Sequence, residues 1–174
     1  MKKIVFALMS LMFPLLVSAQ SDVIKKHNGE TVNGKVKRIE EYTVVFVYDG
    51  EEAENTLSKY AIEKITYGKS GRVEEVTEKI VVRSEDDWDK VIVFEEKSYI
   101  AGLKKVEEIR GKTGLINFQT GNTGDKKADK KLKMAAAAMG CPFVFMTADK
   151  TTVGSSSNQL GGSQVIKKGI AYKY

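Results

Sequence analysis

The stretch KKLKMAAAAMGCPFVFM, residues 130–146, decides how the second half of this chain folds. A basic segment leads into four alanines, and small and apolar residues recur at spacings of four, three and four. This spacing predicts one helix over about 125–139, with Asp125 as its cap. The expected buried stripe consists of Ala128, Leu132, Ala135 and Met139.

The helix is expected to end at a sharp corner. Gly140 stands where a C′ glycine ends a helix, and Pro142 prevents the helix from continuing. Phe143–Met146 is apolar on both faces, which predicts a central strand. Cys141, the only Cys of the chain, lies at this corner with Gly140 and Pro142, and we expect a buried thiol of low reactivity.

The rest of residues 88–174 extends this corner into an α/β unit of order strand, loop, helix, strand, strand. Val91–Phe94 is expected to form a buried strand. The segment 99–124 is ambiguous, because its apolar residues at spacing three suit either a helix or an irregular strand and four glycines follow. Residues 154–162 predict a loop, and the apolar residues alternating over 166–174 predict a final strand.

Residues 20–70 predict a small β-barrel-like module. Asn28-Gly29 between two strand-like runs indicates a hairpin, and Asp49-Gly50 indicates a second turn. The run at 42–48 is rich in β-branched and aromatic residues and apolar on both faces, so it predicts a central strand. A short turn beginning at Ser58 and a closing strand at 65–67 complete the module.

A charged junction at 71–87 separates the two units, and its pattern favours neither helix nor strand. The fold class expected is therefore α+β, with a small bent β-barrel-like module followed by an α/β unit. The sequence leaves open whether the two units pack into one domain.

The first 19 residues have the pattern of a secretory signal peptide. A positive start at Lys2 and Lys3 precedes a short apolar stretch, and small residues predict a cut between Ala19 and Gln20. A lipoprotein would need a Cys at the cut, where Gln20 stands. We therefore expect a periplasmic or secreted protein with no stable membrane span after cleavage.

Charge and cysteine content restrict the partners. Removal of 19 residues leaves 155 of the 174, and the net charge falls from +5 to +3 because Lys2 and Lys3 are lost. Such a mild basic excess gives weak grounds for a polyanion partner. A single Cys allows no internal disulfide, so the fold must depend on its core.

Two resemblances follow from these motifs. Residues 22–67 resemble a module in exported Bacteroidota proteins, through Asn28-Gly29, Gly34, Val36 and the turn residues after Ser58. The resemblance implies a small Sm-like or SH3-like barrel. Residues 88–174 resemble small bacterial envelope families of unknown function, through an alanine-rich helix followed by Gly and a strand. Cys141 replaces the small residue usual at that corner.

The residues offer little for catalysis. Cys141 would follow a helix C-terminus, where the dipole disfavours a thiolate, and His27 lies in the other unit. The serines at 155–157 form no nucleophile elbow. The acidic cluster at 85–89 lacks calcium-loop spacing, and Gly111-Lys112-Thr113 lacks the first glycine of a phosphate loop. We expect no catalytic residue, no cofactor and no metal.

A lysine-rich helix face is the one candidate surface for an anionic partner such as a headgroup or polysaccharide. Its lack of interleaved aromatic residues argues against nucleic acid. Its members are Lys126, Lys127, Lys130, Lys131 and Lys133.

The sequence therefore predicts an exported, non-enzymatic envelope protein that binds an unidentified protein or envelope component or serves assembly. Edge strands in both units would allow homo-oligomers. Two alternatives stay open. One is a small glycan-directed hydrolase that uses two carboxylates, and the other is a carrier of lipids or small ligands.

Overall fold

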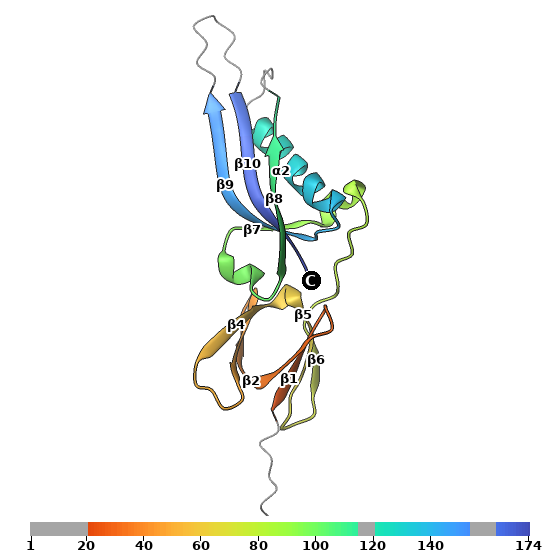
Figure 1. Ribbon diagram of the computed structural model, residues 1–174, viewed down its shortest axis with the longest axis vertical. Coiled ribbons are helices and arrows are strands. Elements are labelled where there is room, and N and C mark those ends of the chain that lie inside the picture. Colours follow the sequence, from red (N-terminus) through yellow and green to blue (C-terminus); the bar gives the residue numbers. More distant parts are fainter. Residues whose placement is uncertain (1–20, 115–120, 154–162) are drawn as a thin grey trace, which may run out of the picture.

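The computed structural model describes residues 21–114, 121–153 and 163–174. Two β-sheets stand one above the other, and one long helix covers a face of the second sheet (Figure 1). The α+β class is thus confirmed. The predicted signal peptide and the predicted loop at 154–162 lie outside the described residues.

The first sheet contains six antiparallel strands in the order β4-β3-β2-β1-β5-β6. Because β4 and β6 stand at opposite ends and do not pair, the predicted barrel is not closed. The short 3-10 helix η2 (Lys59–Ala61) connects β4 to β5. The strands are β1 (Asp22–Lys26), β2 (Thr31–Ile39), β3 (Thr43–Tyr48), β4 (Glu54–Ser58), β5 (Ile62–Thr66) and β6 (Val73–Glu75).

The turns of this sheet follow the sequence. Gly29 and Gly50 have positive φ angles of 93° and 81°, which side chains other than glycine rarely adopt, and both predicted hairpins are confirmed. Strand β3 lies between β2 and β4, as its two apolar faces predict. Gly34 has a different role, since a Cβ there would lie 2.3 Å from the carbonyl oxygen of Val47.

The first sheet continues past the boundary predicted at residue 70. Residues 68–71 form the turn of a hairpin, and Lys64 and Thr66 of β5 pair with Glu75 and Val73 of β6. The first sheet therefore extends to Glu75 and takes part of the predicted junction. The rest of the junction has no regular secondary structure as far as the 3-10 helix η3 (Glu85–Lys90).

The second sheet has four strands in the order β7-β9-β10-β8. Strand β7 is parallel to β9, and the other pairs are antiparallel. The central position predicted for Phe143–Met146 is confirmed, and the ambiguous segment 99–124 begins with a 3-10 helix and continues as a strand. The elements are β7 (Ile92–Phe94), η4 (Lys97–Ile100), β8 (Lys104–Lys112), β9 (Phe143–Val153) and β10 (Ser163–Lys173).

Helix α2 (Gly121–Ala138) begins four residues before the predicted cap, Asp125, because GNTG at 121–124 is helical despite its two glycines. Its end is as predicted. Gly140 has a φ of 64°, its N–H donates to the Ala137 carbonyl at 2.9 Å, and the Cys141 N–H donates to the Ala136 carbonyl at 3.0 Å. These two bonds form a Schellman motif.

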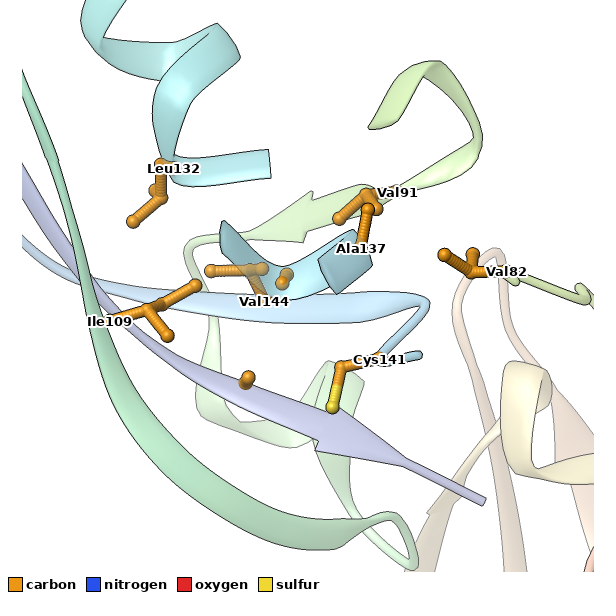
Figure 2. Close-up of a cluster of buried hydrophobic side chains, with 9 residues drawn as sticks. Val82, Val91, Ile109, Leu132, Ala137, Cys141 and Val144 are labelled. Carbon is orange, nitrogen blue, oxygen red and sulfur yellow. The ribbon is translucent and has the colours of Figure 1, made fainter. Parts of the chain in front are cut away.

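Helix α2 packs on the second sheet through a stripe slightly different from the predicted one. Ala128 and Leu132 are fully buried, as expected, but Ala136 and Ala137 replace Ala135 and Met139 as the most buried residues of the last turns. Figure 2 shows part of this cluster, where the helix meets η3, the junction and the sheet.

The two units pack against each other through aromatic rings. Phe143 of β9 is fully buried, with its ring 5.7 Å from that of Tyr60 in the first unit and 5.3 Å from that of Tyr174. The Ser58 N–H also donates to the Ala101 carbonyl at 2.8 Å. The sheets therefore share one apolar interface, which answers the question that the sequence left open.

Candidate functional site

The Cys141 thiol is enclosed. Its residue has no exposed surface and lies within the buried cluster drawn in Figure 2. Its Sγ lies 3.7 Å from the Met139 carbonyl oxygen. Burial raises the pKa of this thiol, and the charge of Lys173 offsets the rise only in part. Both effects of position, the helix C-terminus and the apolar surroundings, disfavour the reactive thiolate.

Cys141 should resist labelling by a thiol reagent in the native protein and react fast after unfolding. Cys141→Ala should cost about 1 kcal/mol of unfolding free energy, because only one buried sulfur is removed. Absorbance-based thiol titration with and without denaturant checks the first result, and urea unfolding checks the second. Labelling of the native protein within seconds would contradict the buried position.

Four lysines of the predicted face of α2 are exposed, Lys133 is half-buried, and two of the five have partners. The ammonium of Lys130 lies 4.6 Å from the ring centroid of Trp88, and Lys133 lies 3.9 Å from a carboxylate oxygen of Asp129. The acidic 3-10 helix η3 packs beside α2. The sequence could not show this proximity, which reduces the positive field that an anionic partner would meet.

A charge cluster that the sequence reasoning missed lies between α2 and the sheet. Lys167 of β10 has a side chain only 8% exposed, and its ammonium is 3.0 Å from Asp125, 3.5 Å from Asp149 and 4.0 Å from Asp129. Burial alone would lower the pKa of Lys167, but the hydrogen bond and charges of the carboxylates raise it. The cluster links β9 and β10 to α2, because Asp149 belongs to β9 and the other two aspartates to α2.

The chain's only histidine lines a groove of about 640 Å³ beside the first sheet. The groove is open, and four of its seven described lining residues carry charged side chains, which does not suit a lipid carrier. Its lining residues are His27, Glu63, Glu75, Val76, Thr77, Glu78 and Lys79.

The hydrogen bonds of this groove leave no activated nucleophile. The Thr77 hydroxyl lies 2.9 Å from the Ile62 carbonyl and 3.0 Å from that of Lys59, both of which only accept. The two carbonyls compete with Nε2 of His27, which lies 3.1 Å from the hydroxyl oxygen, for its single proton. These contacts hold Thr77 against η2 and β5, and they do not favour transfer of the hydroxyl proton to the ring.

His27 joins the two units. Its ring meets the edge of Tyr174 at 4.9 Å, and the Tyr174 hydroxyl accepts from the Ile80 N–H at 2.8 Å. Lys79 donates to the His27 carbonyl at 3.2 Å. Cys141 and His27 thus belong to different clusters, although their units pack together.

The pKa of His27 is lowered, first by burial, while the charge of Glu63 opposes the shift and that of Lys79 adds to it. The unfolded chain then binds a proton more readily, so stability should be complete above pH 6.5 and fall as the pH drops below it. Urea midpoints at pH 8 and at pH 5.5 measure this loss. His27→Gln keeps a side-chain donor for the Thr77 hydroxyl and should abolish most of this loss of stability. If the variant loses as much stability between pH 8 and pH 5.5 as the unchanged protein, His27 is not its cause.

The described carboxyl groups with clearly shifted pKa values include no candidate for a general acid. The pKa of Glu63 in the groove is lowered, mainly by its hydrogen bond from Lys25, and the pKa values of Glu30, Glu40 and Asp87 are lowered in the same way by lysine or arginine partners. A hydrolase acid needs the opposite shift. Glu63, the groove carboxyl among them, therefore does not have the shift of a general acid.

A third surface is the free edge of the second sheet. Strand β8 pairs with β10 on one side and, among the described residues, with no strand on the other. Seven of its nine residues are exposed, and the remaining two, Ile109 and Gly111, face α2. Within the described ranges this is the longest edge strand, since β4 has five residues and β6 and β7 have three each.

Comparison with known proteins leaves these surfaces to be judged on their geometry. No family model, no curated protein and no solved structure matches this chain. Across the described residues, no group of His, Cys, Asp and Glu is arranged to hold a metal ion. The helices of the same residues include none with the length and apolar character to cross a membrane.

Proposed function

We propose that this chain is an exported, non-enzymatic module of the bacterial envelope whose role is binding or assembly. The observation that carries the proposal is the free edge of β8 on a body made of two joined sheets. An unpaired edge offers a row of backbone donors and acceptors that can add a strand from a partner. The signal peptide pattern at 1–19 supports export.

The first unit serves in this proposal as a support rather than a catalytic domain. Its successive antiparallel strands, with β1 paired to both β2 and β5, support an open relative of the small Sm-like or SH3-like barrel. The structural bonds of His27 and Thr77 and the burial of Cys141 support the absence of catalysis. A hydrolytic or transfer activity abolished by changing His27 or Cys141 would contradict the proposal.

Site-specific photo-crosslinking in the producing cells tests the role of the edge. A photoreactive amino acid at Glu108, exposed on β8, should give covalent adducts with a partner chain. The same amino acid at Asp49, in an exposed turn of the first sheet, is the matched control and should give few. Equal or absent adducts at both positions would contradict the proposed function, as would a chain that keeps residues 1–19 and stays in the cytoplasm.

A further inference from the structure

Strand β8 carries charged side chains in a regular order, and they form no ion pairs with the described parts of the chain. Lys104 and Lys105 precede Val106, and Glu107 and Glu108 follow it. All five residues are exposed, and none of the ion pairs within the described parts of the chain involves the four charged side chains. Two lysines and two glutamates thus stand at a free edge without a partner of opposite charge.

The backbone of this edge is equally free. The hydrogen bonds that lie outside the sheet ladders and helices include none from 104–112 among the described residues. Val106, at the centre of the pattern, is 39% exposed although it is apolar. An edge of nine residues with open backbone groups normally requires protection from unwanted pairing.

The charge order is complementary to itself when the direction is reversed. If a second β8 strand runs antiparallel with a two-fold axis near Val106, the lysines at 104 and 105 of each copy lie opposite the glutamates at 107 and 108 of the other. Opposite charges facing across strands stabilise pairing, and like charges oppose it. A parallel arrangement would place lysine on lysine and glutamate on glutamate.

A bulge at Val106 restricts the partners that this edge can take. The register between β8 and β10 shifts so that Glu107 pairs with Ala171 and Lys105 with Tyr172, which leaves Val106 without an opposite residue. Such a bulge bends the edge and makes a poor match for a straight strand. A second copy has the same bend at the same point, so the two-fold axis brings matching shapes together.

We propose that two copies of this chain pair through β8, antiparallel about Val106, and join their second sheets into one continuous sheet of eight strands. This inference deepens the proposed function, because it names a second copy as the partner of the edge. The Val106 side chains meet at the axis, and the four lysine–glutamate pairs select this register.

Charge reversal tests the pairing with the exported form of the whole chain. Lys104→Glu with Lys105→Glu makes the segment acidic, and Glu107→Lys with Glu108→Lys makes it basic. Each double variant should dissociate at least about tenfold more readily than the unchanged protein, since every cross-strand pair becomes repulsive. Light scattering after size-exclusion chromatography at several concentrations measures this change, and circular dichroism checks that each variant folds.

Mixing gives the decisive readout. The acidic and basic variants, combined in equal amounts, should form mixed dimers that native mass spectrometry resolves by mass. The variant with all four changes should again pair with itself. The control, Lys126→Glu with Lys127→Glu on the exposed face of α2, should leave the dimer unchanged.

A chain that is monomeric at every concentration, or mixed variants that do not pair, would overturn the inference. If crosslinks from Glu108 then lead to a different protein, the edge still binds a partner and the proposed function survives. If no crosslinks form either, both fail. High salt should weaken a true lysine–glutamate pairing, and a dimer insensitive to the reversals would overturn the inference as well.

Discussion

Gly111→Ala should be among the most destabilising single changes in this chain. A Cβ at Gly111 would lie 2.0 Å from the carbonyl oxygen of Ala128 and 2.7 Å from the backbone nitrogen of Leu132. Both neighbours are backbone atoms of α2, so no side-chain rotation relieves the contact. The helix must move away from β8, which should cost about 3 kcal/mol or more of unfolding free energy or prevent folding.

Gly29→Ala is the matched control, because it adds the same methyl group where no atom lies within 4 Å. Its cost comes only from the positive φ of 93° and should be about 1–2 kcal/mol. Urea unfolding followed by circular dichroism compares the two variants. Equal midpoints, or a Gly111→Ala variant as stable as the unchanged protein, would show that α2 does not rest on β8 as described.

Phe143→Ala should have a comparably large effect, for a different reason. The Phe143 ring is fully buried. Its centroid lies within 6.0 Å of the ring centroids of Phe94, Tyr60 and Tyr174, which come from both units. Its removal leaves a cavity at the contact between the sheets. The expected loss is about 3–5 kcal/mol, and the first unit should lose support together with the second.

The measurement uses the single Trp88, which reports on the second unit, beside circular dichroism, which reports on both. Unfolding of the unchanged protein should give coincident curves, and Phe143→Ala should move both to lower urea. Val81→Ala, at a residue 50% exposed, is the control and should change the free energy by no more than about 0.5 kcal/mol. A Phe143→Ala midpoint equal to that of the control would contradict the shared interface.

Local patterns were sufficient to predict the hairpins and the helix–strand corner. Asn28-Gly29 and Gly140 each act within a few residues, through a positive φ that glycine adopts, so the sequence alone indicates the turn or the helix end. The buried position of Cys141 followed from the same local argument.

Contacts between distant segments could not be predicted. The turn at 68–71 reads as a linker until its pairing partner in β5 is known, and β6 was therefore assigned to the junction. Lys167 has one signal in the sequence, because its spacing from Val165 and Ala171 puts it on the same buried face of the final strand, but its three aspartates come from α2 and β9. The free edge of β8 likewise depends on strand order, which a sequence does not state.

Pairing through β8 is best tested by native mass spectrometry of the protein purified, without overexpression, from the cells that produce it. We expect a complex of twice the mass of one chain, with each chain beginning at Gln20, and we expect it to separate in high salt. A species with the mass of one chain, with neither a second copy nor any other partner bound under mild extraction, would contradict a role of β8 in binding.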